Sequence, residues 1–224
     1  MNDKHYFEKI FSTQRMDKYF KRYPGNEQKA IEHYQLNIEL SESFYSILSI
    51  FEIALRNSLN RELSRKYGDS WYLTIGSVSG LNSLSKNINK AKQQITSRNE
   101  IVTADKVVAE LTLGFWVKLL NSEYERILWK PLRNAFPYVE KNQRQRHRIS
   151  APINKIREFR NRVFHYEPIA WNLSKLEEIR NSIYNVMSWL NIDLPYFAIT
   201  IDKSKNAIEM MKRKLQNFNS ATHV

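Results

Sequence analysis

Residues 47–63 read ILSIFEIALRNSLNREL, and they lie within a longer stretch, residues 26–67, that contains neither glycine nor proline. Apolar residues recur in it at steps of three and four, which puts them on one face of a helix. Gly68 is expected to end this helix. A break near Ser41, where Ser-Glu-Ser can cap a new start, divides the stretch into two helices. The apolar face comprises Ile47, Ile50, Phe51, Ala54, Leu55, Leu59 and Leu63.

The rest of the chain has few helix breakers, since all 224 residues include only five glycines and six prolines. Pro152 is expected in the first turn of a helix, where proline is tolerated. Trp71 to Gly80 is expected to be a connection, and Tyr196 to Ile201 forms a weak strand-like run. The apolar spacing predicts further helices at residues 7–20, 81–98, 104–120, 124–136, 152–165, 172–190 and 203–218.

These elements predict an all-α protein, a helical bundle with additional helices at both ends. We expect residues 1–25 to be an N-terminal extension and residues 26–191 to be the main helical domain. Residues 192–224 are expected to form a basic helical extension packed on that domain. Its last helix either binds nucleic acid or only packs on the bundle. The five tryptophans lie mainly in apolar runs and are interpreted as core residues.

Composition excludes several classes of protein. The chain has no cysteine, so a disulfide scaffold, a thiolate metal site and a cysteine nucleophile are ruled out. A run of about 18 apolar residues is absent from the sequence, and the start Met1-Asn2-Asp3-Lys4-His5 precedes no long apolar stretch. We therefore expect a cytoplasmic protein with neither a membrane span nor a signal peptide.

The charge balance favours a polyanionic partner. Lys and Arg number 35 against 23 Asp and Glu, which gives a net charge of +12. Such an excess favours nucleic acid, although a basic protein without such a partner is the alternative. Residues 141–162 hold eight basic residues against the single acid Glu158. Arginine predominates there, which suits bidentate phosphate contacts. The candidate RNA-binding residues are Arg144, Arg146, Arg148, Arg157 and Arg162.

Within this segment, Arg160 falls on the apolar side of the predicted helix, between Ile153 and Ile156 on a helical wheel. A charge that faces a core is costly unless it is paired or used. Asn161 and His165 lie four residues apart on one edge, where their side chains can form a hydrogen bond. The alternative is that the arginines form a solvated basic face and that the histidine is structural.

An Arg and a His beside a basic surface can cleave RNA without a metal. A histidine exchanges protons near neutral pH, and an arginine neutralises charge that builds on a phosphate. RNA carries its own nucleophile, the 2′-hydroxyl. The sequence has no HxxxH or HExxH spacing and no cluster of acidic residues of the nuclease type, so we expect no metal site.

Three segments resemble the Abi-like (abortive infection) branch of the HEPN superfamily. Residues 160–165, RNRVFH, resemble its RNxxxH motif. Residues 51–57, FEIALRN, followed by 67-YGDSW-71, resemble its ExxxRN helix and YGxxW sequence. Residues 111–116, LTLGFW, resemble its LTLGxW helix. The three segments follow one another along the chain in the order found in this family, and together they cover most of residues 26–190.

This resemblance implies a HEPN-type helical bundle that forms a homodimer, with a composite active site where the two motif helices meet. It implies a metal-independent endoribonuclease without a cofactor, a toxin or phage-defence effector restrained by an antitoxin protein or a small RNA. His165 would be the acid or base, Arg160 would hold the phosphate and Asn161 would orient the pair. Glu52 and Arg56 would support the site, either by pairing with each other or through Glu52 neutralising Arg160.

One position departs from the pattern. HEPN toxins that are paired with a nucleotidyltransferase carry a tyrosine two residues after the histidine, whereas Tyr166 follows His165 directly and Glu167 occupies that position. Control by nucleotidylation of that tyrosine is therefore not expected. Two other functions stay open. One is a non-catalytic RNA-binding module bound by a regulatory small RNA, and the other is a helical interaction scaffold in which Arg160 is a structural ion-pair residue.

Overall fold

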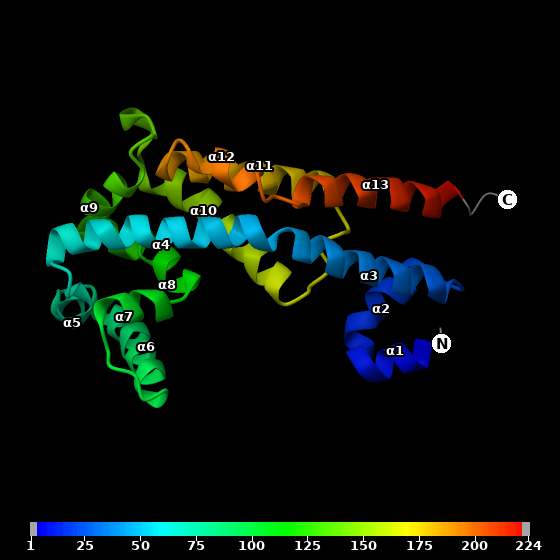
Figure 1. Cartoon of the computed structure of the whole chain (residues 1–224), viewed down its shortest axis with the longest axis horizontal. Coiled ribbons are helices and arrows are strands. Elements are labelled where there is room, and N and C mark those ends of the chain that lie inside the picture. Colours follow the sequence, from blue (N-terminus) through cyan, green and yellow to red (C-terminus); the bar gives the residue numbers. More distant parts are fainter. Residues whose placement is uncertain (1–3, 221–224) are drawn as a thin grey trace. The chain divides into compact units, whose positions relative to one another are not determined.

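The computed structural model describes residues 4–220, and the side chains up to residue 216. Every element within residues 4–220 is helical and none is a strand, which confirms the all-α prediction (Figure 1). Residues 1–3 and 221–224, at the tips of the two predicted extensions, lie outside the described residues. None of the described helices is both long enough and apolar enough to cross a membrane.

The longer helices are followed or joined by short ones. Single turns of 3₁₀ helix cover Ile75–Ser77, Asn82–Leu84, Ser122–Tyr124, Arg133–Ala135 and Lys141–Gln143, and Glu125–Trp129 is a π-helical turn. The α-helices are α1 Lys4–Phe11, α2 Thr13–Arg22, α3 Glu27–Ser43, α4 Tyr45–Tyr67, α5 Trp71–Thr74, α6 Ser85–Ser97, α7 Ala104–Glu110, α8 Leu113–Lys118, α9 Lys130–Leu132, α10 Arg146–Phe164, α11 Leu173–Leu190, α12 Leu194–Ile199 and α13 Ser204–Ser220.

The chain divides into two compact units, each assembled from separate stretches of sequence. Unit 1 comprises residues 1–46, 160–180 and 201–224, and unit 2 comprises residues 47–159 and 181–200. The domain boundaries expected after residues 25 and 191 stay predictions.

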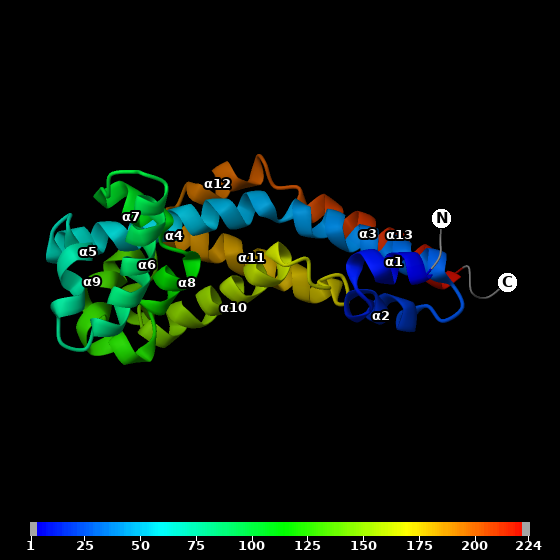
Figure 2. The same ribbon diagram turned by 90° about the horizontal axis from the view of Figure 1, so that it is seen from below.

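Unit 1 is a helical assembly in which α2 packs on both α1 and α3, and α3 packs on α13 (Figures 1 and 2). Ile208 and Met211 are buried on the inner side of α13. Arg180 donates from Nε to the buried carboxylate of Asp202 at 2.9 Å. The basic C-terminal helix is therefore part of the packing of unit 1. The core under α2 and α3 comprises Met16, Tyr19, Phe20, Ala30, Ile31 and Tyr34.

Unit 2 buries the apolar face of α4 and two of the tryptophans. Trp71 and Trp116 are fully buried, with ring centroids 6.0 Å apart, and the Trp71 indole donates to Asn60 at 2.9 Å. These two residues confirm the prediction of core tryptophans. The prediction is wrong for Trp171, whose side chain is 36% exposed, and for Trp129 and Trp189, which are only partly buried.

One predicted helix and one predicted break in the N-terminal half need correction. Residues 7–20 are not one helix, because Ser12 has a φ of 72° and its side chain accepts a hydrogen bond from the backbone N–H of Arg15, which starts α2. The break between α3 and α4 falls at Phe44. Ser41 and Ser43 do not cap α4, since their hydroxyls donate back to carbonyls of α3. Gly68 ends α4 with a φ of 85°, as expected.

Proline 152 does not start a helix, because α10 begins at Arg146 and contains Pro152 in its interior. An interior proline lacks one backbone hydrogen bond. The extra turn buries Ile149 on the same face as Ile153 and Ile156, and this burial offsets the lost bond.

The strand-like run is also wrong, since Tyr196 to Ile199 belong to helix α12. Pro195 lies in the first turn of α12, where its fixed φ favours a helix start. Only Ala198 of this helix is buried, while Tyr196 and Phe197 are 72% and 60% exposed. The apolar residues of this run are therefore mostly on the surface of a helix and not in a buried strand.

Candidate active site

The motif residues lie at the C-terminal end of α10, and all of them belong to unit 1. Arg160 and Asn161 are in the last helical turns, and His165 follows the final helical residue, Phe164. The Arg160 guanidinium lies over the Phe164 ring, 4.2 Å from its centroid. A cation in this position is attracted by the electrons of the ring face. Arg160, partly buried, is thus directed toward the end of the helix that carries His165.

The helical wheel that places Arg160 beside Ile153 and Ile156 also predicts Val163 and Phe164 on the apolar side, and the structure corrects this for Phe164. Val163 is fully buried, whereas Phe164 is 38% exposed and stacks on Tyr45 at a centroid distance of 4.7 Å. Phe164 therefore forms a two-sided contact, with an aromatic ring and a guanidinium. Such an arrangement fixes the ring at the base of the turn that follows.

The chain leaves α10 through a Schellman turn. The N–H of Tyr166 donates to the carbonyl of Val163 at 3.1 Å, and the N–H of Glu167 donates to that of Arg162 at 2.9 Å. Tyr166 has a φ of 50°, at a position that glycine usually occupies. A tyrosine there costs about 1–2 kcal/mol of backbone strain, so other contacts must hold the turn. We call residues 165–170 the motif turn.

Asn37 on α3 holds the second half of the motif turn. Its amide oxygen accepts from the backbone N–H groups of Ile169 at 2.8 Å and Ala170 at 3.2 Å, while its amide nitrogen donates to the carbonyl of Glu167. Asn37 is fully buried. One side chain therefore makes three hydrogen bonds where water cannot replace them, and an unpaired polar group at this place would destabilise the fold.

The first half of the motif turn is held by α2 and α4. Arg15 donates to the carbonyls of Tyr166 at 2.9 Å and His165 at 3.3 Å, which satisfies carbonyls left open at the helix end. The hydroxyl of Tyr45 is hydrogen-bonded to Tyr166, and this bond, followed by burial, raises the pKa of Tyr45 to about 12. Tyr45 therefore keeps its proton at neutral pH.

The His165 side chain is exposed, and within the described residues it makes no hydrogen bond or ion pair. The expected side-chain bond between Asn161 and His165 does not form. Instead the backbone N–H of His165 donates to the carbonyl of Asn161 at 3.0 Å. The physical reason is that His165 lies where the chain turns out of the helix, so its side chain no longer follows the helical edge.

Two of the predicted RNA-binding arginines are held by internal contacts. Arg144 donates from Nε to the carbonyl of Val139 at 2.7 Å and from Nη2 to that of Pro137. Arg146 is paired with Glu125 at 2.8 Å and also bonds Ser150, with its side chain 17% exposed. Both guanidiniums therefore have structural partners in unit 2.

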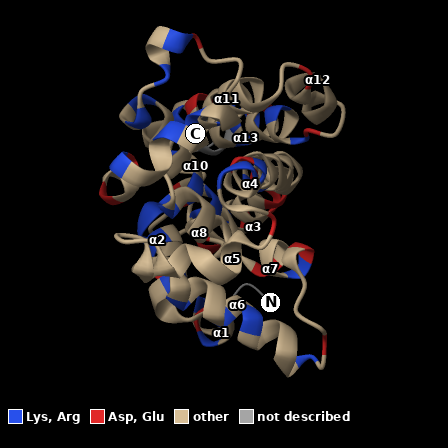
Figure 3. Cartoon of the chain, turned by 90° about the vertical axis from the view of Figure 1, so that its left-hand side faces the viewer, with Lys and Arg blue, Asp and Glu red and all other residues tan. Residues whose placement is uncertain are grey.

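The other three arginines differ from one another. Arg162 donates to the carbonyl of Pro168 and lies 3.5 Å from the carboxylate of Glu167, so it ties the motif turn to α10. Arg148 is exposed and donates to the side chain of Gln143. Arg157 is partly buried, and its Nε has no hydrogen-bond partner among the described residues. Figure 3 marks the Lys and Arg positions of the described residues in blue.

The supporting residues predicted on α4 are half-buried. Arg56 donates from Nε to Asn57 at 3.3 Å. Across the described side chains, no group of three or more His, Asp or Glu residues is placed to hold a metal ion. Arg160, Asn161 and His165 thus form the candidate active site with no candidate metal ligand set.

Sequence reasoning missed Arg15, Asn37 and Tyr45, which hold the motif turn. One signal could have found Asn37. It shares the inward face of α3 with Ala30, Tyr34 and Ser41, and an amide on an apolar face needs buried partners. No local signal marks Arg15, because its partners lie 150 residues further along the chain.

The chain was compared with models of protein families, with curated proteins and with solved structures, and none of the three comparisons gives a match. The candidate active site is therefore described by its own geometry: an arginine held over an aromatic ring, and an exposed histidine on a turn that three distant side chains fasten.

Proposed function

We propose that this protein is a metal-independent endoribonuclease of the HEPN kind, acting as an effector or toxin in abortive-infection phage defence. The observation that carries the proposal is the pair formed by Arg160 and His165 at the end of α10. Arg160 is directed along the helix by Phe164, and His165 is exposed on a turn held by Arg15 and Asn37. RNA is proposed as the substrate because the pair belongs to a basic segment and because the sequence resembles HEPN motifs.

The chemistry follows from these two side chains. A neutral His165 takes the proton from the 2′-hydroxyl of RNA, whose oxygen attacks the adjacent phosphorus. The bond from phosphorus to the 5′-oxygen breaks, and that oxygen takes a proton from a protonated histidine. The Arg160 guanidinium neutralises the negative charge that builds on the phosphoryl oxygens. The products are a 2′,3′-cyclic phosphate end and a 5′-hydroxyl end.

The contacts that fix the motif turn support this role for His165. A general base must sit within hydrogen-bond reach of the proton that it takes, so a loosely placed base loses rate. The contacts of Arg15 and Asn37 fix the backbone on either side of Tyr166 while leaving the imidazole of His165 exposed to substrate. Such an arrangement combines a fixed backbone with an accessible proton acceptor.

The test is incubation of the purified protein with total cellular RNA in EDTA. Wild type is expected to cleave RNA and leave cyclic phosphate ends, and His165→Ala is expected to lower the rate by about 10²–10⁴-fold. His147→Ala is the matched control, since His147 is also an exposed histidine of the basic segment. It is expected to cleave at the wild-type rate. Circular dichroism confirms that both variants keep the helical fold.

The outcomes separate the candidate functions. Equal cleavage by wild type and His165→Ala would contradict the proposed role of His165. Binding of RNA without cleavage by any of the three proteins would favour the non-catalytic RNA-binding module over the nuclease. Loss of fold in Arg160→Gln, with neither cleavage nor RNA binding in wild type, would favour the interaction scaffold.

A further inference from the structure

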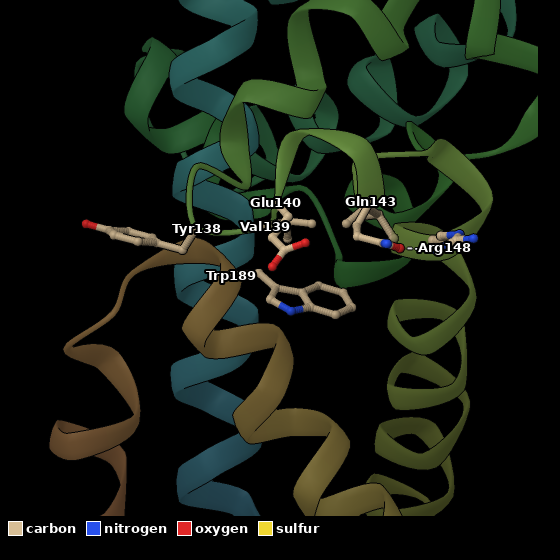
Figure 4. A pocket seen from close by; sticks show the side chains of 7 residues that line it. Tyr138, Val139, Glu140, Gln143, Arg148 and Trp189 are labelled. Atoms are coloured by element: carbon tan, nitrogen blue, oxygen red, sulfur yellow. Dashed lines mark hydrogen bonds between the residues drawn. The ribbon is translucent and has the colours of Figure 1, made fainter.

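Unit 2 contains a groove that is lined by none of the candidate active-site residues. It has a volume of about 400 Å³ and is open to solvent on one side. Val139 and Ile149 form its buried apolar floor. Its walls come from α10, from α11 and from the loop that precedes α10. The residues that line it are Tyr138, Val139, Glu140, Gln143, Arg148, Ile149 and Trp189 (Figure 4).

The loop side of the groove is held in shape by the protein itself. Arg144 donates to the carbonyls of Pro137 and Val139, so its guanidinium links the two ends of the loop. The backbone N–H of Tyr138 donates to the carbonyl of Trp189 at 3.4 Å, which attaches the loop to α11. This wall of the groove is therefore largely preformed, and binding of a ligand costs little conformational entropy there.

Trp189 supplies a flat aromatic surface in this groove. Figure 4 shows its indole extending from α11 toward α10, beneath the loop, while the Tyr138 ring points the other way. The side chain is only partly buried. A partly exposed indole beside an apolar floor is a surface on which a nucleobase can stack, because every base has a π face.

Two charged side chains, Glu140 and Arg148, also line the groove (Figure 4). Arg148 is exposed and is oriented by its hydrogen bond to Gln143. Glu140 is exposed, and its carboxylate bonds to none of the described side chains. A guanidinium is suited to a phosphate. A carboxylate repels phosphate and accepts a hydrogen bond from an exocyclic amino group, as it does from the N4 amino group of cytosine.

We propose that this groove binds one unpaired, amino-bearing nucleobase of single-stranded RNA. Trp189 stacks on the base, Glu140 accepts a hydrogen bond from its amino group, and Arg148 contacts the adjacent phosphate. The net charge of +12 and the surrounding basic segment favour a polyanion as the occupant. This inference rests on the proposed function for the identity of the nucleic acid, and it adds a recognition site to it.

The experiment measures binding alone, by fluorescence anisotropy in EDTA, with every protein carrying His165→Ala so that no RNA is cleaved. The probes are labelled oligocytidine and oligouridine of about 12 nucleotides, a length that single-stranded binding sites span. Uracil presents an acceptor where cytosine presents its amino group. Oligocytidine is expected to bind about tenfold more tightly than oligouridine.

Three substitutions test the three roles. Trp189→Leu is expected to weaken binding of both probes by at least about fivefold, and Trp189→Phe to retain most of the affinity. Glu140→Ala is expected to bring the ratio of the two affinities close to one. Arg148→Gln is expected to reduce the slope of log affinity against log salt by about 0.7. Arg213→Gln, an exposed arginine of α13, is the charge-matched control and should change affinity less.

The proposal is overturned if wild-type affinity for the two probes is equal, if Trp189→Leu binds as well as its parent, or if Arg148→Gln and Arg213→Gln behave alike. Absence of binding to either probe overturns it as well. None of these results depends on cleavage. If the protein cleaves RNA but the groove substitutions leave binding unchanged, only the proposed groove site is contradicted. If the groove substitutions weaken binding but wild type does not cleave RNA, only the proposed nuclease function is contradicted.

Discussion

At the scale of single residues, His33 is a buried histidine without full hydrogen bonding. It is 1% exposed, its Nδ1 lies 2.9 Å from the hydroxyl of Tyr23, and its Nε2 has no partner among the described residues. The rings of Tyr19 and Trp171 pack edge-on around it. Burial, and then the charge of Arg22, lowers the pKa of His33 to about 4. It is therefore neutral in the folded protein at neutral pH.

This burial predicts a loss of stability in acid. The unfolded chain binds a proton at His33 below about pH 6.5, whereas the folded protein binds it only near pH 4. Between these values the unfolded state holds more protons, so the free energy of unfolding falls as pH falls. The loss from His33 amounts to about 3 kcal/mol at most. Urea unfolding at pH 7 and at pH 4.5 measures it.

The comparison variant is His33→Gln, which keeps a polar side chain without a titrating group. Its free energy of unfolding should fall less than that of wild type between the two pH values, while His147→Gln, at an exposed position, should follow wild type. Identical pH dependence in His33→Gln and wild type would show that His33 does not contribute.

At the scale of elements, α10 contains an interior proline. Its missing N–H leaves the helix one bond short near the carbonyl of Arg148, in a helix that carries both groove and active-site residues. By contrast, Pro195 is in the first turn of α12, where no bond is lost. The two prolines thus differ in cost although both belong to helices.

Replacing each proline by alanine tests this difference. Pro152→Ala restores a backbone donor and is expected to raise the free energy of unfolding by about 1–3 kcal/mol. Pro195→Ala is expected to change it by less than about 0.5 kcal/mol. Chemical denaturation measures both. An equal effect of the two substitutions would mean that α10 accommodates Pro152 without cost.

At the scale of the whole molecule, the separation of Arg160 and His165 on one chain bears on how an active site is completed. His165 lies beyond the last helical residue of α10, so its side chain does not share a helical edge with Arg160. Within the described residues no hydrogen bond joins the two side chains, since His165 bonds only through its backbone. From the resemblance to HEPN proteins we predict that residues of a second copy complete the site in a homodimer.

Mixing two inactive variants tests a composite site. Arg160→Gln and His165→Ala are each expected to lose RNA cleavage when assayed alone. After they are mixed and allowed to exchange subunits, a heterodimer regains one intact pair if each site takes its arginine from one chain and its histidine from the other. About a quarter of wild-type activity is then expected. Mixing that restores nothing, in dimers shown by light scattering to exchange, would place both residues of a site on one chain.

The sequence by itself determined the all-α class and the approximate position of most of the longer helices. These features depend on local causes: apolar residues at steps of three and four, and breakers such as Gly68. It also located the basic segment and the Arg160–His165 pair. The failures at Ser12 and Tyr196 have local causes, a side-chain cap and a proline in the first helical turn. At Pro152 the helix is extended by the burial of an apolar residue, which only the packed chain possesses.

Only the tertiary structure decided which residues of the basic segment are available and what holds the motif turn. Arg144 and Arg146 look like Arg148 in sequence, yet internal carbonyls and Glu125 engage the first two. Arg15 and Asn37 reach the motif turn from more than 100 residues away in the chain. Such contacts depend on distances in space between segments remote in sequence, and no local pattern of residues encodes those distances.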